Sequence, residues 1–85
     1  MEKEQARKII EALLYMTDHA LSVQEIGAVM ENKISEQDVR VFLAEISTHL
    51  ESNGSALRLV EVAGGFQMST QPDMAPWIRR LFKER

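Results

Sequence analysis

The sequence predicts a small α+β domain, mostly helical, in which three helices precede a two-stranded ribbon and a fourth helix. Three observations predict this order. Apolar residues recur at helical spacing up to Gly54, the pattern then changes to strand-like alternation, and two serines each stand three positions before an acidic residue, as at helix starts. With 85 residues and 45% hydrophobic content, the chain is expected to form one domain, 1–85, around one modest core.

A first amphipathic helix is expected from Lys3 to Met16, before Asp18 and His19 break the pattern. A second, short helix should open at Ser22, because Ser22 and Glu25 form a capping-box signal. Glycine weakens a helix by about 1 kcal/mol relative to alanine, so Gly27 is expected to permit a close approach to a neighbouring helix. The residues of this second helix expected to face inward are Ile26, Val29 and Met30.

The start signal repeats at Ser35 and Asp38, which predicts a third helix that stops near Ser52. Asn53 and Gly54 are expected to supply the left-handed conformations that end it. Its predicted buried stripe consists of Val39, Phe42, Leu43, Ile46 and Leu50. Two helices joined by a tight turn make a helix-turn-helix.

Two strands are expected at 57–62 and 66–70, because both stretches are rich in strand-forming residues. Between them, Gly64 and Gly65 tolerate the positive backbone angles of a tight hairpin. Pro72 ends this ribbon, and Asp73 is expected to cap a last helix with Pro76 in its first turn. The apolar face of that helix consists of Trp77, Ile78, Leu81 and Phe82. The resulting order, α-α-α-β-β-α, is that of a winged helix, in which the two-stranded ribbon is called the wing.

The charge of the third helix argues against DNA. In a winged helix this element reads DNA, yet four acids and one base lie along it: Glu36, Asp38, Arg40, Glu45 and Glu51. Phosphate contact needs basic residues, and the formal net charge is −3. The fold is therefore expected to hold a protein partner. A winged-helix DNA-binding transcription regulator remains the alternative, and it would need basic side chains on the third helix or the wing.

Catalytic and metal chemistry find no support in the sequence. There is no cysteine, and the only histidines are His19 and His49. We recognise no nucleophile beside a base, no glycine-rich loop that could hold a phosphate and no group of metal ligands. We therefore expect no enzyme activity and no cofactor. The lack of cysteine excludes disulfides and fits a cytosolic chain. The apolar run around Leu13 is too short to span a bilayer, so no membrane contact is expected.

Three stretches resemble the N-terminal domain of the bacterial segregation and condensation protein B family. They are Ile10 to Leu14, Leu21 with Ser22, and above all Leu59 to Thr70, which reads LVEVAGGFQMST. Members carry an aromatic residue after the paired glycines and a threonine at the end of the strand. Several also have a basic residue near the positions of Gln67 or Ser69. Neither position is basic here, which weakens a DNA role for the wing.

The resemblance implies an architectural function without catalysis. Family members form a condensin-like complex with a kleisin subunit, segregation and condensation protein A, and through it with the SMC ATPase, and the complex compacts and segregates chromosomes. They pair through their N-terminal domains as homodimers, and a second winged-helix domain helps to grip the kleisin. The resemblance therefore implies an N-terminal domain of a longer protein, located in the cytoplasm and associated with the nucleoid through the complex.

A partner surface is also expected from the residues alone. A domain this small cannot bury all its apolar side chains, so a surplus should mark an interface. The first helix is too apolar for one stripe, and the last helix adds large aromatic side chains of the kind that anchor interfaces. The candidate interface residues are Ile9, Leu13, Met16, Trp77, Leu81 and Phe82, and the candidate wing turn is Gly64, Gly65 and Phe66.

Overall fold

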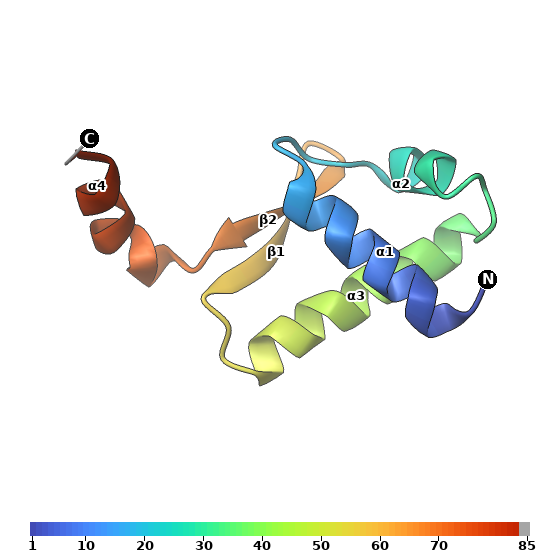
Figure 1. Ribbon diagram of the computed structural model, residues 1–85, viewed down its shortest axis with the longest axis horizontal. Helices are drawn as coiled ribbons and strands as arrows, with labels where there is room; N and C mark the ends of the chain where they lie inside the picture. The colour runs from blue at the N-terminus through green and yellow to red at the C-terminus, as the bar shows by residue number, and fades with distance from the viewer. Residues whose placement is uncertain (84–85) are drawn as a thin grey trace.

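The computed structural model describes residues 1–83 and has the predicted winged-helix order (Figure 1). The helices are α1 (Lys3–Met16), α2 (Val23–Val29), α3 (Glu36–Ser52) and α4 (Ala75–Lys83). The strands are β1 (Leu57–Val62) and β2 (Gly65–Thr70), and a 3-10 turn, η1 (Pro72–Met74), leads into α4. We call residues 3–70 the body. In Figure 1 α4 lies beyond the open end of the ribbon, away from α1, α2 and α3.

The core lies where α1, α2 and α3 meet. Each fully buried aliphatic side chain contributes roughly 1.5–3 kcal/mol, so this cluster stabilises the body. The ribbon closes one side of the cluster with half-buried Leu59, Phe66 and Met68. The buried members are Ala6, Ile10, Leu14, Val23, Ile26, Met30, Val39, Phe42, Leu43 and Ile46.

Both predicted serine caps are confirmed. The Ser22 hydroxyl accepts a hydrogen bond from the Glu25 N–H at 3.0 Å, and the Ser22 N–H donates to Glu25 Oε1 at 2.9 Å. The hydrogen bond from the Ser22 backbone lowers the pKa of the Glu25 carboxyl, and the Ser22 side chain lowers it further. At the start of α3 the Ser35 hydroxyl accepts from the Asp38 N–H at 3.1 Å. These contacts satisfy backbone donors that a helix start leaves free.

The ribbon is an antiparallel hairpin in which Leu57 faces Thr70 and Val62 faces Gly65. The positive backbone angles of its turn fall on Ala63 (φ 49°) and Gly64 (φ 81°), so the prediction that both glycines supply them is wrong for Gly65. Gly65 is needed for space instead. A Cβ there would lie 3.0 Å from the Ala20 Cβ and 3.1 Å from backbone carbons of the α1–α2 loop.

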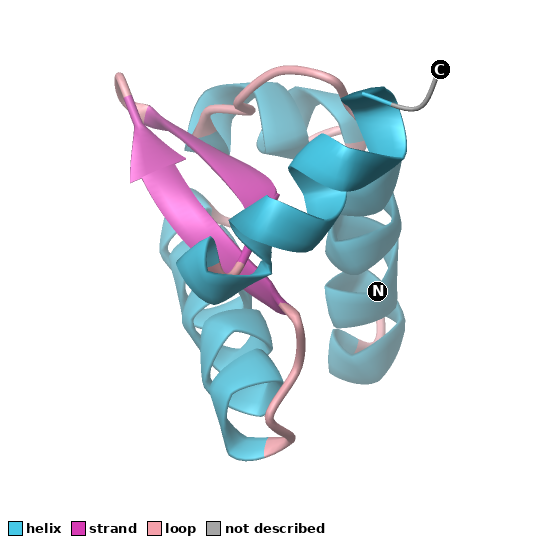
Figure 2. Ribbon diagram, turned by 90° about the vertical axis from the view of Figure 1, so that its left-hand side faces the viewer, coloured by secondary structure: helices cyan, strands magenta, loops and turns pink. Residues whose placement is uncertain are grey.

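The ribbon is tied to the α1–α2 loop beside Gly65. The Leu21 N–H donates to the Phe66 carbonyl at 2.8 Å, and the Phe66 N–H donates back to the Leu21 carbonyl at 2.7 Å. These two bonds form an isolated bridge between the loop and β2. The ribbon is therefore fixed to the helices at its turn. Figure 2, viewed from the α4 side, shows the strands in magenta with helices of the body behind them.

Four local predictions are wrong. Val29 is 59% exposed, because it lies off the face of α2 that carries the buried residues, whereas Met30, one position further on, is only 4% exposed. A Cβ on Gly27 would meet only the Asn32 side chain at 3.7 Å, so no helix approaches it closely. Asn53 has a negative φ of −96°, which leaves Gly54 alone in the left-handed region. Asp73 lies inside η1, which begins at Pro72 after Gln71, and it caps nothing.

Candidate partner interface

α4 exposes the apolar face that the sequence predicts. Within this helix, described in full from Ala75 to Lys83, no residue is buried. Trp77 is 63% exposed, Leu81 53% and Phe82 64%, while Ile78 is half-buried. Residues four apart on a helix are neighbours, so Trp77 with Leu81 and Ile78 with Phe82 form one continuous strip. We call these four residues the α4 face.

The rest of the α4 surface is basic. Arg79, Arg80 and Lys83 are the charged residues of this helix, and it has no acidic one. The Arg80 guanidinium lies over the Trp77 ring, 4.9 Å from its centroid, at the distance of a cation–π contact. In contrast, the residues before Pro72 include 11 acidic and six basic side chains. A basic, apolar helix is thus attached to an acidic body.

The structure divides the predicted α1 residues between core and surface. Ile9 is half-buried and packs against the core, and Leu13 is half-buried. Met16 is 76% exposed at the end of the helix. Tyr15, 75% exposed beside it, was not among the predicted interface residues, although its place in the apolar run could have suggested it. α1 therefore offers an apolar surface at its C-terminal half.

The wing turn is a structural joint and not part of either apolar surface. Gly64 is exposed at the tip, Gly65 is buried against the α1–α2 loop, and Phe66 is half-buried against the core. The predicted site residues thus fall into three separate groups, on α1, on α4 and at the wing turn. In Figure 1 the wing turn and α4 lie at opposite ends of the ribbon.

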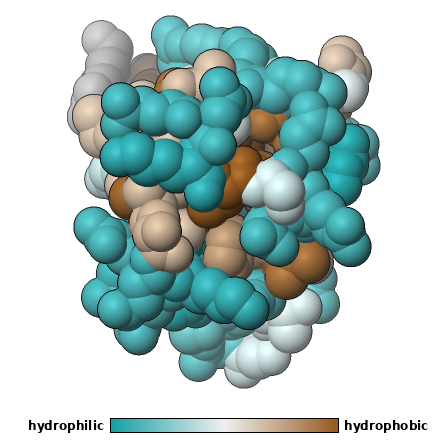
Figure 3. Space-filling view, turned by 90° about the vertical axis from the view of Figure 1, so that its right-hand side faces the viewer, coloured by the Kyte–Doolittle hydropathy of each residue, from teal (hydrophilic) through white to brown (hydrophobic). Residues whose placement is uncertain are grey.

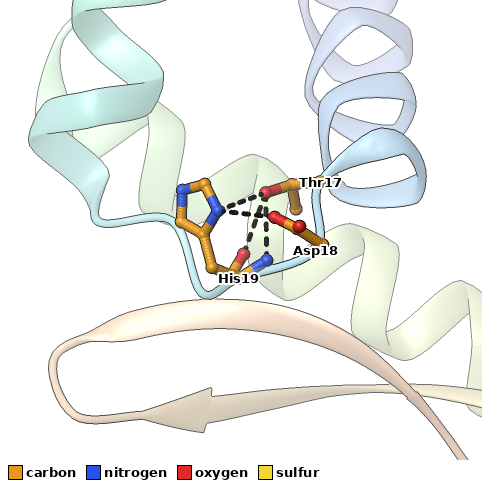
Figure 4. Close-up of polar contacts among 3 residues, drawn as sticks. All are labelled: Thr17, Asp18 and His19. Atoms are coloured by element: carbon orange, nitrogen blue, oxygen red, sulfur yellow. Dashed lines mark hydrogen bonds and ion pairs between the residues drawn. The ribbon is translucent and has the colours of Figure 1, made fainter.

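Thr17, Asp18 and His19 form a polar cluster directly after α1 (Figure 4). His19 Nδ1 lies 3.0 Å from Asp18 Oδ1 and 3.4 Å from Thr17 Oγ1. The hydrogen bond with the His19 ring lowers the pKa of the Asp18 carboxyl. A hydrolytic relay needs the carboxylate and the nucleophile on different ring nitrogens, whereas here both approach Nδ1. The cluster therefore closes a loop and has no relay geometry.

The outer surface of α3 carries acidic side chains, and beside it lie basic side chains from the start of α1. Where α3 meets the start of α1, a groove of about 360 Å³ has three acidic and two basic residues in its wall. Figure 3 views the end of the molecule opposite α4 and shows a small hollowed apolar area bordered by polar side chains. The groove is lined by Lys3, Glu4, Arg7, Asp38, Val41, Phe42 and Glu45. Such a surface does not match a phosphate backbone.

Two further kinds of site are lacking from the described part of the chain. Among residues 1–83 no group of three or more histidine, aspartate or glutamate side chains could hold a metal ion. None of the helices in this range is long and apolar enough to cross a membrane.

The chain is similar in sequence to several bacterial relatives. "Segregation and condensation protein B" of Desulforamulus reducens is 29% identical over 96% of this chain and 44% of its own length. The proteins of the same name from Syntrophotalea carbinolica and Geobacillus kaustophilus are each 32% identical. They match over 100% and 89% of this chain, and over 42% and 35% of their own lengths. The chain thus spans less than half of each relative.

Solved structures share the fold. ScpB from Mycobacterium tuberculosis superposes with a TM-score of 0.89 over 99% of this chain and 51% of its own, at 21% identity. A dimer of the ScpB N-terminal domain complexed with ScpA peptide superposes with a TM-score of 0.80 at 32% identity. The latter match covers 92% of this chain and 95% of that one. The family model described as "Segregation and condensation complex subunit ScpB" matches residues 8–85, so the chain belongs to that family, as the resemblance predicts.

Proposed function

We propose that this chain is the N-terminal winged-helix domain of a longer, non-catalytic subunit of the bacterial SMC–kleisin complex. It acts in chromosome condensation and segregation by pairing with itself and by binding the kleisin subunit, segregation and condensation protein A. The observation that carries the proposal is the similarity to the ScpB N-terminal domain, which was solved as a dimer with an ScpA peptide. Because the match covers nearly all of both chains, the same elements are available here.

The α4 face supports the self-pairing half of the proposal. Trp77, Leu81 and Phe82 are exposed on one side of a helix, and large aromatic side chains are typical interface anchors. An isolated helix shorter than about 12–15 residues is marginal in water, and α4 has nine. A partner that covers this face would stabilise the helix.

Contact without catalysis fits the chemistry of the described residues. Asp18 Oδ1 and Thr17 Oγ1 both contact Nδ1 of His19. This geometry stabilises a loop and does not form a proton relay. We propose that the domain contributes only binding surfaces and that the SMC ATPase, reached through the kleisin, supplies the chemistry. On this proposal the protein is cytoplasmic and reaches the nucleoid through the complex.

The alternative function, a DNA-binding transcription regulator, is disfavoured by charge. Glu36, Asp38, Glu45 and Glu51 lie on α3, the helix that would have to enter the major groove. The wing offers Gln67 and Ser69 where a phosphate contact would need a basic side chain. Binding to a DNA duplex of arbitrary sequence tests this alternative, because phosphate contacts dominate non-specific affinity for DNA.

Size-exclusion chromatography with light scattering tests self-pairing, kleisin binding and DNA binding in one set of experiments. The chain is run alone, with a labelled peptide of the kleisin from the same genome, and with a labelled non-specific duplex in low salt. We expect a dimer that co-elutes with the peptide and apart from the duplex. A monomer, or a dimer that ignores the kleisin, would contradict the proposal. Co-elution with the duplex would favour the regulator.

A further inference from the structure

α3 ends in a Schellman motif, a pair of backbone hydrogen bonds that closes the last turn of a helix. The Gly54 N–H donates to the Glu51 carbonyl at 3.2 Å, and the Ser55 N–H donates to the Leu50 carbonyl at 3.0 Å. Gly54 has the left-handed φ of 60° that this motif requires. The two bonds satisfy carbonyl groups that the end of a helix leaves free, so they fix the last turn of α3.

The side chain of Asn53 is fastened to the same turn. Its Nδ2 donates a hydrogen bond to the His49 carbonyl at 2.8 Å, and it lies 3.2 Å from Nδ1 and 3.1 Å from Nε2 of the His49 ring. The amide therefore turns back along the helix and supplies a donor to a carbonyl at the negative end of the helix dipole.

The two residues that end the helix are also a chemically reactive pair. The chain has two asparagines, and Asn32 precedes Lys33 whereas Asn53 precedes Gly54. Asparagine is a thermolabile residue, and a following glycine leaves the main-chain nitrogen unshielded by a side chain. Asn53 and Gly54 are exposed, and a Cβ built on Gly54 would meet nothing within 4 Å. The Gly54 nitrogen is thus the less hindered of the two nitrogens that follow an asparagine.

We propose that Asn53 is a site of spontaneous deamidation, that the closed end of α3 slows the reaction, and that the product opens this end. The Gly54 nitrogen gives up its proton to solvent and attacks Cγ of Asn53. A bond forms between the Gly54 nitrogen and Cγ, and the Cγ–Nδ2 bond breaks. Nδ2 takes a proton from solvent and leaves as ammonia, so a cyclic imide remains and nothing is oxidised or reduced.

Water then opens the imide at one of two bonds. Cleavage between the Gly54 nitrogen and Cγ leaves an ordinary aspartate at position 53. Cleavage between the Gly54 nitrogen and the main-chain carbonyl carbon of residue 53 leaves an isoaspartate, in which the main chain runs through Cβ and Cγ. Both products carry a carboxylate where Asn53 has a neutral amide.

The closed end of α3 slows the reaction because it occupies both reacting groups. The Gly54 N–H, which must lose its proton, is bonded to the Glu51 carbonyl, and the Asn53 amide is held toward His49. At 3.2 Å the Gly54 bond is at the long end of the usual range for such bonds. Helix ends open locally without unfolding of the whole domain, so the reaction proceeds through these openings.

The product opens this end because it removes the contacts that close it. A carboxylate at position 53 has no N–H to donate to the His49 carbonyl, and it adds negative charge beside Glu51 at the negative end of the dipole. In the isoaspartate, the additional main-chain methylene also moves Gly54 and Ser55 away from the carbonyls that they bond. Because residues 53–56 connect α3 to β1, deamidation loosens the joint between a core helix and the wing.

Timed incubation of the purified chain at neutral pH and body temperature tests the reaction. Peptide mapping by mass spectrometry locates the modified residue, and isoaspartyl methyltransferase detects isoaspartate. We expect Asn53 to convert roughly tenfold faster than Asn32, because only Asn53 precedes a glycine. Conversion should be slower in the folded chain than in the chain unfolded in guanidinium chloride. Gly54→Ala should slow it, because the added methyl group shields the attacking nitrogen.

The effect of the product is tested with Asn53→Asp, which reproduces the ordinary aspartate. We expect its Tm to lie about 2–6 °C below that of the wild type. Gln37→Glu is the matched control, because it makes the same change from amide to carboxylate on an exposed residue in the first turn of α3. Negative charge is favourable at that end of a helix, so Gln37→Glu should not lower the Tm.

Each part of the proposal has a result that overturns it. If Asn53 stays intact in the folded chain, or converts no faster than Asn32, it is not a site of deamidation. Equal rates in the folded and unfolded chain would show that the end of α3 does not slow the reaction. An Asn53→Asp variant as stable as the wild type would show that the product leaves the end of α3 closed.

Discussion

α3 and α4 are both amphipathic helices, yet their apolar faces have opposite surroundings. α3 buries Val39, Phe42, Leu43 and Ile46 against α1 and α2, and it also contacts β1. α4 buries none of its residues from Ala75 to Lys83. The same pattern of residues thus indicates that a face needs a cover without saying which molecule provides it. For α3 the cover is the chain itself, and for α4 we propose a second copy.

The largest expected effect compares one leucine from each helix. Leu43 is 2% exposed, so Leu43→Ala should lower the free energy of unfolding by about 2–5 kcal/mol through lost burial and a residual cavity. Leu81→Ala should change it by less than about 0.5 kcal/mol at concentrations where the wild type is monomeric, because exposed substitutions have small effects. Urea unfolding monitored by circular dichroism measures both.

The roles of the two leucines should reverse when dimerisation is measured. Leu81→Ala should weaken pairing without loss of folding, whereas Leu43→Ala should weaken it only to the extent that the body unfolds. If both substitutions lowered the stability of the dilute monomer by similar amounts, the contrast between a covered Leu43 and an uncovered Leu81 would be wrong. They would mean that the body already covers Leu81.

Trp77 gives the next largest effect and a direct signal. It is the only tryptophan of the chain, so its emission reports the surroundings of α4 alone. Dilution of the dimer should shift the emission to longer wavelength as the indole becomes exposed. Trp77→Ala should weaken pairing by about 2 kcal/mol or more, as truncation of an aromatic anchor does. Emission that does not change with concentration would place Trp77 outside the interface.

Gly65→Ala tests the body without touching α4. The new Cβ would lie about as close to the α1–α2 loop as atoms can come, 3.0 Å from the Ala20 Cβ and 3.1 Å from backbone carbons. Because backbone cannot yield as a flexible side chain can, we expect a loss of about 1–3 kcal/mol in unfolding free energy. Gly54→Ala, at a positive φ with open space around it, should cost only about 1 kcal/mol.

The fold of the body is predictable because its signals are local and agree with one another. Ser22 and Ser35 mark the starts of α2 and α3, and the change of period after Gly54 marks the ribbon, so the order of elements follows from short stretches. Helical spacing also identifies the apolar face of α4. The family resemblance, carried by Leu59 to Thr70, is confirmed by the family model.

The errors come from contacts between distant segments and from competition between neighbouring signals. Gly65 was predicted to turn the chain, but its neighbour in space is Ala20, which no local pattern reveals. Asp73 carries a cap signal, yet Pro72 starts the 3-10 turn first. The separation of α4 from α1 is also not visible in the sequence, because spacing on a helix does not say where the helix lies.

The smallest expected effect is a dependence on pH at the start of α2. The Ser22 backbone N–H donates to the Glu25 carboxylate, which lowers the pKa of Glu25 below its ordinary value of 4.5. A carboxyl with a lowered pKa stabilises the fold at pH values above its ordinary pKa, and this contribution is lost as the pH falls through the lowered value.

Glu25→Gln keeps an acceptor oxygen but removes the charge. The wild type should therefore be more stable than this variant at about pH 7, and this advantage should be smaller at about pH 3, below the ordinary pKa. Urea unfolding at both pH values measures the difference, with Glu11→Gln on exposed α1 as the control. The same advantage at both pH values would show that the charge of Glu25 contributes nothing to the cap.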